Sequence, residues 1–217
     1  MLDCCTTHKR GAGRCFSRFA KSYRKRFSKK GLEPSQKHLI EGITQQGISK
    51  SRLLEIGSGV GYLHMLLLEQ GAASATGIDL SENMISEARD WAQRRGLQDK
   101  VKYRVGDFTD FRSEIDPADV TIMDKVICCY PDAPLLLDAS LEKTLRVYAV
   151  TYPRDRLSTR IVWRLGRLFF KLIGSDFRPY LHSPQMIEGT IESHRFSKHY
   201  EEQTFIWLTQ VYVKNQQ

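Results

Sequence analysis

Residues 53–61 read Leu-Leu-Glu-Ile-Gly-Ser-Gly-Val-Gly, and this stretch decides the fold. An apolar strand pattern leads into three glycines at alternate positions, and the helical pattern YLHMLLLEQG follows over residues 62–71. A strand, a glycine-rich turn and a helix in this order form the corner of an open α/β sheet where ligands bind. Glycine lets the backbone approach a bound molecule where any Cβ would clash. The stretch therefore predicts a ligand site directly after the first strand.

Strand and helix patterns alternate through the rest of the chain. Because helices of this length separate the strands, we expect βαβ units and a doubly wound, mostly parallel α/β sheet of seven strands, one of them reversed. The last two strands have a short connection and are expected to pair antiparallel. Strands are predicted at 51–57, 74–80, 100–107, 119–127, 146–152, 194–203 and 204–214, and helices at 62–71, after the N-cap Ser81, at 135–145 and at about 155–173.

The basic charge is concentrated at the N-terminus. Residues 1–31 hold ten Lys/Arg and one acid, whereas the remaining residues hold 23 bases and 24 acids. We expect disorder over 1–13, a helix over 14–30 that Gly31 ends, and a second helix over 33–47. Residues 1–47 are therefore predicted to be a basic tail and helical arm, and residues 48–217 the main domain.

The arm allows three interpretations. It could cover the ligand site with Phe16, Phe19 and Tyr23 facing inward, it could bind an anionic membrane, or it could bind RNA. We rank them in this order, because no nucleic-acid-binding module accompanies the charge.

Spacing separates two classes of nucleotide ligand. The dinucleotide fingerprint G-x-G-x-x-G requires glycine at position 62, where this chain has Tyr62. A pyrophosphate also disfavours a nearby acid, yet Glu55 lies at the end of the strand. An acid at this position suits a ligand that is cationic or rich in hydroxyls.

Two more acids follow at strand ends. Asp79 ends the second strand, 18 residues beyond Gly61, where a carboxylate can accept both hydroxyls of a ribose. Asp107 ends the third strand and can accept from an exocyclic adenine amine, while Phe108 offers an apolar contact to the base. The acids and the glycine turn together predict an adenosine-containing ligand.

LLEIGSGVG (53–61), GIDLS (77–81) and VGDF (105–108) resemble the first three motifs of class I S-adenosylmethionine-dependent methyltransferases. The resemblance covers about residues 50–152. It implies a Rossmann-like methyltransferase fold and its strand order, with S-adenosylmethionine as cofactor. It further implies that Asp79 contacts the ribose, that Asp107 and Phe108 contact the adenine, and that the methionine portion is lined by Gly57, Gly59 and Gly61.

The later motifs are less specific. DKVICCYPD (124–132) and TYPRD (151–155) are similar to small bacterial methyltransferases of uncharacterised function and, more distantly, to magnesium-protoporphyrin methyltransferases. These motifs do not name a substrate.

Asp124 ends the fourth strand, at the sheet edge that faces the reactive methyl group in this architecture. Methyl transfer from a sulfonium is a direct displacement, so placement of the acceptor supplies most of the acceleration. A general base is needed only if the acceptor must lose a proton, and Asp124 and Tyr130 are the candidate catalytic residues. Lys125, Cys128 and Cys129 lie nearby, although adjacent cysteines are more often buried small hydrophobes. We expect the acceptor pocket between Asp124, Tyr130, Tyr152 and the loop 175–184, where Tyr180 and His182 could reach it.

The helix at 155–173 is amphipathic. Arg156, Arg160, Arg164, Arg167 and Lys171 form one stripe, and an apolar face opposes it, made of Leu157, Ile161, Leu165, Leu168, Phe169 and Leu172. A helix of this kind normally packs its apolar face on the domain. The alternative is an interfacial helix that contacts lipid.

The sequence thus predicts methyl transfer to a small-molecule or lipid-like acceptor, with peripheral membrane contact as a further expectation. The alternatives are a nicotinamide-dependent oxidoreductase and a non-catalytic module that binds membrane or RNA. Five cysteines, an odd number, suit a reducing compartment, and no apolar run is long enough to span a membrane, so a cytoplasmic location is expected. The N-terminal Cys4, Cys5, His8 and Cys15 lack the usual spacing of a zinc site, and no metal is expected.

Overall fold

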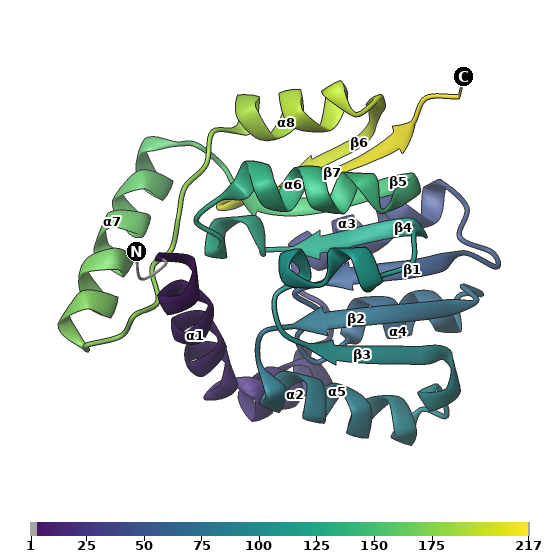
Figure 1. Ribbon diagram of the computed structural model, residues 1–217, viewed down its shortest axis with the longest axis horizontal. Helices are drawn as coiled ribbons and strands as arrows, with labels where there is room; N and C mark the ends of the chain where they lie inside the picture. The colour runs from purple at the N-terminus through teal and green to yellow at the C-terminus, as the bar shows by residue number, and fades with distance from the viewer. Residues whose placement is uncertain (1–3, 217) are drawn as a thin grey trace.

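The computed structural model describes residues 4–216, with side chains described from residue 11 onward. The described chain forms a seven-stranded sheet in the order β3-β2-β1-β4-β5-β7-β6 (Figure 1). Neighbouring strands from β3 to β5 are parallel, and β7 is antiparallel to both β5 and β6, so β7 is the reversed strand. The expected doubly wound sheet is confirmed. The strands are β1 Arg52–Ile56, β2 Ser74–Asp79, β3 Val101–Val105, β4 Ala118–Asp124, β5 Thr144–Pro153, β6 Phe196–Gln203 and β7 Trp207–Lys214.

Helices cover both faces of the sheet, and one apolar cluster fills each side. The face under α6 and α8 buries Leu136 and Ile187, whereas the face under α3, α4 and α5 buries Leu39, Leu63 and Ala88. Figure 1 shows α1 and α7 apart from these layers, beyond the carboxyl ends of the parallel strands. The helices are α1 Cys4–Ser17, α2 Ala20–Lys30, α3 Pro34–Gln45, α4 Tyr62–Glu69, α5 Glu82–Arg94, α6 Ala133–Glu142, α7 Leu157–Leu172 and α8 Pro184–Ser193.

The N-terminal arm differs from the sequence prediction. Residues 4–13, expected to be disordered, belong to α1, and the single helix expected over 14–30 is broken between Ser17 and Ala20. Two glycines allow α1 to pack closely against Asp176 and Leu80. A Cβ on Gly11 would lie 2.8 Å from the carbonyl carbon of Asp176, and a Cβ on Gly13 would lie 2.9 Å from the Leu80 oxygen. Tertiary contacts of this closeness cannot be read from local periodicity. The division of the chain at residue 47 stays a prediction.

Two other elements depart from expectation. Helix α8 was missed, although its start carries a recognisable signal: the Ser183 side chain accepts from the Met186 N–H, and Pro184 occupies the first turn. The fourth strand ends at Asp124 and not at Ile127, because Lys125 adopts a φ of 61° that no strand can continue. The predicted N-cap is confirmed, since the Ser81 hydroxyl accepts from the Met84 N–H at 3.2 Å.

Candidate active site

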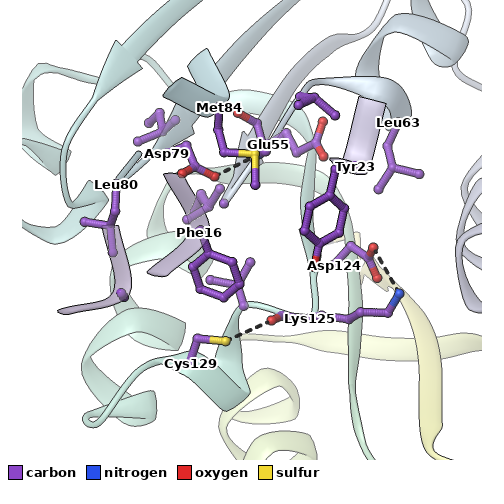
Figure 2. A pocket seen from close by; sticks show the side chains of 18 of the residues that line it. Phe16, Tyr23, Glu55, Leu63, Asp79, Leu80, Met84, Asp124, Lys125 and Cys129 are labelled. Atoms are coloured by element: carbon purple, nitrogen blue, oxygen red, sulfur yellow. Dashed lines mark hydrogen bonds and ion pairs between the residues drawn. The ribbon is translucent and has the colours of Figure 1, made fainter. Parts of the chain in front are cut away.

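A cavity of about 420 Å³ lies at the carboxyl ends of β1, β2 and β4, beneath the N-terminal arm (Figure 2). Its wall joins the turn after β1, the ends of the next strands and residues of α1, α2 and α3. Nearly all of the predicted site residues line it, namely Glu55, Gly57, Gly59, Asp79, Asp107, Phe108, Asp124 and Tyr130. Gly61 is the exception, because it is not among the described residues that line the cavity.

The three glycines of the turn have positive φ angles but different surroundings. Gly59, at φ 53°, would direct a Cβ into open space, so its backbone borders the cavity freely. A Cβ on Gly61, at φ 82°, would meet the His64 ring at 2.8 Å and the Met65 methyl group at 2.9 Å. Gly61 therefore leaves room for the His64 and Met65 side chains in the first turn of α4, whereas Gly59 adds no side chain at the cavity wall.

Asp79 is fixed by the turn that it faces. Its carboxylate accepts from the Gly59 N–H and the Ser81 N–H, each at 2.8 Å. Burial raises the pKa of Asp79 to about 6, and the two backbone hydrogen bonds oppose this shift. The carboxylate is thus oriented toward the cavity, and further hydrogen-bond donors there would stabilise its charge.

At the end of β3, Asp107 and Tyr130 form one hydrogen-bonded group. The Tyr130 hydroxyl donates to Asp107 at 3.0 Å, and its oxygen lies 2.9 Å from that of Thr109. Thr109 also donates to Asp107 through its backbone N–H and its hydroxyl. Phe108 beside them is buried. The structure therefore brings the Tyr130 hydroxyl to Asp107.

Glu55 has a protein partner that the sequence did not suggest. Its carboxylate lies 2.5 Å from Nδ1 of the buried His64, and it also accepts from the His64 backbone N–H at 3.2 Å. On the far side of the ring, Nε2 of His64 contacts the Tyr103 hydroxyl at 2.9 Å. Glu55 is thereby held in position at the base of the cavity. The only sequence signal was a histidine in the first turn of a helix that follows the glycine turn.

Asp124 is a buried carboxylate with one oxygen engaged. Its Oδ2 accepts from the Gln36 amide at 2.9 Å and lies 3.8 Å from Nζ of Lys125. Within the described residues, Oδ1 has no hydrogen-bond partner. Burial raises the pKa of Asp124 above its usual range, while Lys125 and Gln36 oppose the shift. An orphaned buried acceptor in a cavity wall is a group that a ligand can satisfy.

Helix α3 supplies side chains to this corner that sequence reasoning missed. Glu33, which precedes α3, accepts from Nζ of Lys125 at 2.6 Å, and Arg26 binds its other oxygen at 2.6 Å. Gln36, one turn later, reaches Asp124. No sequence signal links residues 26–36 to residue 124, because the contact arises only when the arm folds across the sheet edge.

The arm forms part of the cavity wall. Phe16 and Tyr23 line it as expected, and Figure 2 shows Tyr23 reaching into the pocket with its hydroxyl toward Asp124. Burial raises the pKa of Tyr23, and the charge of Glu33 adds to this effect. Phe19 was also expected to face inward, but it is not among the described residues that line the cavity and is 49% exposed; Tyr23 lines the cavity at its outer edge and is 42% exposed.

Contacts with α5 and α4 hold the arm in place. Arg24 binds both Glu87 at 2.7 Å and Asp90 at 2.6 Å, and Phe27 stacks on Tyr62 with ring centroids 3.7 Å apart. The two hydroxyls of Ser17 and Ser81 lie 2.7 Å apart.

Several residues expected at the acceptor pocket lie elsewhere. Tyr152 is fully buried in the core, with its hydroxyl on Gln210 at 2.6 Å. His182 contacts the Tyr130 carbonyl at 2.9 Å and, within the described residues, Tyr180 and His182 are not part of the cavity wall. Cys129 lines the cavity, but its hydrogen bond with Cys128 and its burial raise the pKa of its thiol, which disfavours the nucleophilic thiolate.

Neither a metal centre nor a membrane span emerges from the described part of the chain. Among these residues, no group of three or more metal-ligating side chains comes together, and no helix is long and apolar enough to cross a bilayer. The side chains of Cys4, Cys5 and His8 lie outside the described residues, so the expectation that they bind no metal with Cys15 stays a prediction.

Solved structures share this fold. Magnesium protoporphyrin IX methyltransferase from Synechocystis PCC 6803 with bound SAH matches 96% of this chain and 100% of its own chain, with a TM-score of 0.72 and 18% identity. A putative S-adenosylmethionine-dependent methyltransferase from Listeria monocytogenes matches 84% of this chain and 99% of its own, with a TM-score of 0.68 and 16% identity. At these identities the likeness concerns the fold.

Sequence comparison adds a shorter match. Ribosomal protein L11 methyltransferase from Desulforamulus reducens is 32% identical over 100 residues, which is 45% of this chain and 32% of that protein. The chain thus spans about a third of the length of this relative. The family described as "Methyltransferase domain" matches residues 48–204, which is most of the chain and includes the glycine turn, Glu55, Asp79, Asp107 and Asp124. The chain therefore belongs to this family of methyltransferase domains.

Proposed function

We propose that the protein transfers a methyl group from S-adenosylmethionine to a small-molecule or lipid-like acceptor. One observation carries the proposal: the Asp79 carboxylate is held by the Gly59 N–H at the wall of a cavity that five carboxylates and two cations line. The ligand carries an ammonium, a sulfonium and two ribose hydroxyls, all of which suit an acidic wall.

The residues present fit this ligand. The cavity volume of about 420 Å³ lies within the range of small-molecule sites. Asp79 is proposed to accept the ribose hydroxyls, Asp107 and Phe108 to contact the adenine, and Gly57 and Gly59 to border the methionine portion. Tyr130 would position Asp107 through their hydrogen bond. Glu55 contributes negative charge below the methionine portion.

When bound, S-adenosylmethionine supplies an activated methyl group on a sulfonium. The protein has to exclude water and to hold the acceptor in line with that group. Phe16 and Tyr23 of the arm provide an apolar cover. The free oxygen of Asp124 is proposed to accept a hydrogen bond from the acceptor and to take its proton if it must lose one, and a raised pKa makes this carboxylate a stronger base. Asp124 is therefore the proposed catalytic residue, and Tyr130 is kept as a candidate whose hydroxyl is bound to Asp107.

The position of the arm over the cavity supports a small or lipid-like acceptor. The arm covers the site, so a folded protein would need the arm to open before its side chain could reach Asp124. The L11 methyltransferases act on a ribosomal protein by name, but the chain spans only a third of such a relative. Their acceptor is therefore not transferred to this protein.

Titration calorimetry with S-adenosylmethionine, S-adenosylhomocysteine and NAD tests the donor assignment. We expect the first two ligands to bind and NAD to show no heat. Asp79→Ala should weaken binding by tenfold or more, because a charge-assisted bond contributes about 1.5–3 kcal/mol. Asp99→Ala, an exposed acid beyond the cavity, is the matched control and should bind like the wild type. Equal affinity in wild type and Asp79→Ala would contradict the assignment.

The acceptor class needs a separate experiment. Methyl-labelled S-adenosylmethionine is incubated with the protein and a total cell extract, and the label is then partitioned between organic solvent, water and precipitated protein. Label in the organic phase, or in an aqueous product separated from the unreacted donor by chromatography, that is lost with Asp124→Asn supports a lipid-like or small acceptor. Label in precipitated protein would overturn the acceptor class while leaving the donor assignment intact.

A further inference from the structure

Helix α7 packs on the molecule through a stripe that is not its leucine-rich face. Thr159, Trp163, Gly166 and Phe170 recur at steps of 4, 3 and 4, and these are its least exposed residues. The Trp163 indole N–H donates to the Tyr180 carbonyl at 2.8 Å, and its ring contacts Trp207 with centroids 5.9 Å apart. The expectation that the helix packs its leucine face on the domain is therefore wrong.

The leucine face of α7 is turned to the outside. Leu157, Leu165 and Leu172 are 75%, 61% and 77% exposed, and their neighbours on this side are exposed as well. A run of large apolar side chains over more than four helical turns is far more than scattered surface hydrophobics. We call the following set the leucine face: Leu157, Ile161, Leu165, Leu168, Phe169, Leu172 and Ile173.

A row of cations borders the leucine face. Arg160, Arg164, Arg167 and Lys171 follow the same helical spacing and are exposed. Arg160 binds Asp155 at 2.6 Å. The segment 154–178 holds seven Lys/Arg and two Asp, whereas residues 32–153 and 179–217 together hold 16 bases and 22 acids. The positive charge of the folded domain is thus concentrated where the apolar face is open.

The N-terminal arm does not share this property. It is also basic and amphipathic, but its apolar residues Phe16, Ala20 and Phe27 pack against Tyr62, Met84 and Trp91. The two basic segments therefore differ: most apolar residues of the arm pack on the domain, with Phe19 and Tyr23 49% and 42% exposed, whereas the whole leucine face of α7 is exposed.

We propose that the leucine face and its cationic row dock this protein on an anionic lipid bilayer. An apolar helical face bordered by Lys/Arg suits the boundary between headgroups and acyl chains, where the leucines enter the apolar layer and the cations contact anionic headgroups. Membrane docking does not require the proposed methyl transfer.

Helix α7 also lies at the rim of the cavity. Trp163 contacts Trp207, which lines the cavity, and Phe170 contacts Phe177, which in turn contacts Phe16 of the arm. Figure 1 shows α7 beyond the carboxyl ends of the parallel strands, on the same side as α1. A docked helix would hold the site close to the bilayer, where a lipid-borne acceptor could enter. This last step, unlike docking itself, rests on the proposed function.

Vesicle sedimentation of the full chain tests the proposal. The vesicles consist of phosphatidylglycerol and phosphatidylcholine in equal parts, or of phosphatidylcholine alone. We expect binding to the anionic vesicles that falls with salt, and much weaker binding to the neutral ones. Arg164→Gln combined with Arg167→Gln should weaken binding by about 30-fold, because each cation near an anionic surface contributes roughly a fivefold gain.

Two substitution pairs separate docking from folding. Leu165→Glu with Leu168→Glu should abolish binding. Leu135→Glu with Leu145→Glu changes two leucines of similar character, 40% and 44% exposed, on other elements, and should leave binding unchanged. Circular dichroism and S-adenosylmethionine calorimetry on all variants show whether the fold and the donor site survive, so failure of docking and failure of the proposed function can be told apart.

Three outcomes would overturn the proposal. One is no sedimentation with either vesicle. Another is equal loss of binding in both leucine pairs. The third would be seen in analytical ultracentrifugation without lipid: the wild type self-associates, and Leu165→Glu with Leu168→Glu abolishes this association. The leucine face would then join two copies of the chain.

Discussion

The Asp79 carboxylate accepts a hydrogen bond from the Gly59 N–H at 2.8 Å, so the end of β2 is tied directly to the glycine turn after β1. The fold itself therefore holds this acid in place through backbone hydrogen bonds. The ribose hydroxyls of S-adenosylmethionine could therefore bind this carboxylate with little rearrangement of the side chain.

The affinity for S-adenosylmethionine should depend on pH through Asp79. Burial raises the pKa of Asp79 to about 6, and ribose hydroxyls bind its ionised form better. Affinity measured by calorimetry should therefore strengthen as pH rises from 5 to 7 and then level off, with up to about a tenfold change per pH unit below 6. Asp79→Asn should bind more weakly, with a flat profile over this range. A wild-type profile as flat as that of the variant would contradict the prediction.

The stability of the ligand-free protein should change in the opposite direction. A carboxyl whose pKa is raised on folding contributes stability below its unfolded pKa, and this contribution is lost as pH rises through the folded pKa. For Asp79 that window runs from about pH 4 to about pH 6. Urea unfolding of wild type and Asp79→Asn should show the wild type losing stability relative to the variant across this window, on the order of 1–3 kcal/mol. A constant difference would exclude Asp79 as the titrating group.

Gly59→Ala and Gly61→Ala should fail in different ways. Alanine at Gly59 is strained by about 1–2 kcal/mol but meets no atom, so we expect modest destabilisation and a marked loss of S-adenosylmethionine affinity. Alanine at Gly61 would also collide with His64 and Met65, so its free energy of unfolding should fall by about 2–5 kcal/mol. Urea unfolding and calorimetry on both variants check this contrast. Equal destabilisation of the two variants would contradict the different roles assigned to these glycines.

Asp124→Asn should stabilise the protein at pH 8. Because burial raises the pKa of Asp124, its ionised form costs stability at neutral and alkaline pH, and asparagine keeps an oxygen that can accept from Gln36. The advantage of the variant over the wild type should shrink as pH falls and Asp124 becomes protonated. Thermal unfolding at pH 8 and pH 5 measures both effects. A variant less stable than the wild type at pH 8 would show that the Asp124 charge is fully compensated.

The arm should respond to the donor ligand. Phe16 and Tyr23 line the cavity, so S-adenosylhomocysteine should slow amide hydrogen exchange over residues 11–30. Arg24→Ala removes the ion pairs with Glu87 and Asp90 and should speed exchange of the arm without ligand. Arg94→Ala, which removes only the exposed pair with Asp90, is the control and should have little effect. If neither S-adenosylhomocysteine nor Arg24→Ala changes the amide exchange rates of residues 11–30, the arm does not cover the site.

The sequence by itself determined the sheet and the position of the site. Strands and helices differ in the period of their apolar residues, so the alternating patterns predicted the doubly wound fold before any contact was known. Asp79 and Asp124 are the last residues of their strands, Asp107 lies two residues after β3, and the carboxyl ends of parallel strands share one edge of the sheet. For that reason the strand-end acids, together with Glu55, Gly57 and Gly59, line one cavity.

Only the tertiary structure decided which contacts are made by the arm, Gly61, Tyr130 and Tyr152. Each depends on residues far away in sequence: the arm on α5, the Tyr130 hydroxyl on Asp107, and the Tyr152 hydroxyl on Gln210. Gly61 lies in the same motif as Gly59, yet its surroundings include the His64 ring. Local patterns carry no information on such contacts.

Helix α7 gives the clearest case. Its sequence contains two stripes that could pack, the leucine face and the stripe of Thr159, Trp163, Gly166 and Phe170, and hydrophobicity alone favours the leucines. The structure buries the second stripe, where the Trp163 N–H reaches the Tyr180 carbonyl, its ring contacts Trp207 and the Phe170 ring contacts Phe177. Periodicity defines which residues share a face, but the shape and the hydrogen-bonding groups of the surface opposite decide which face is buried.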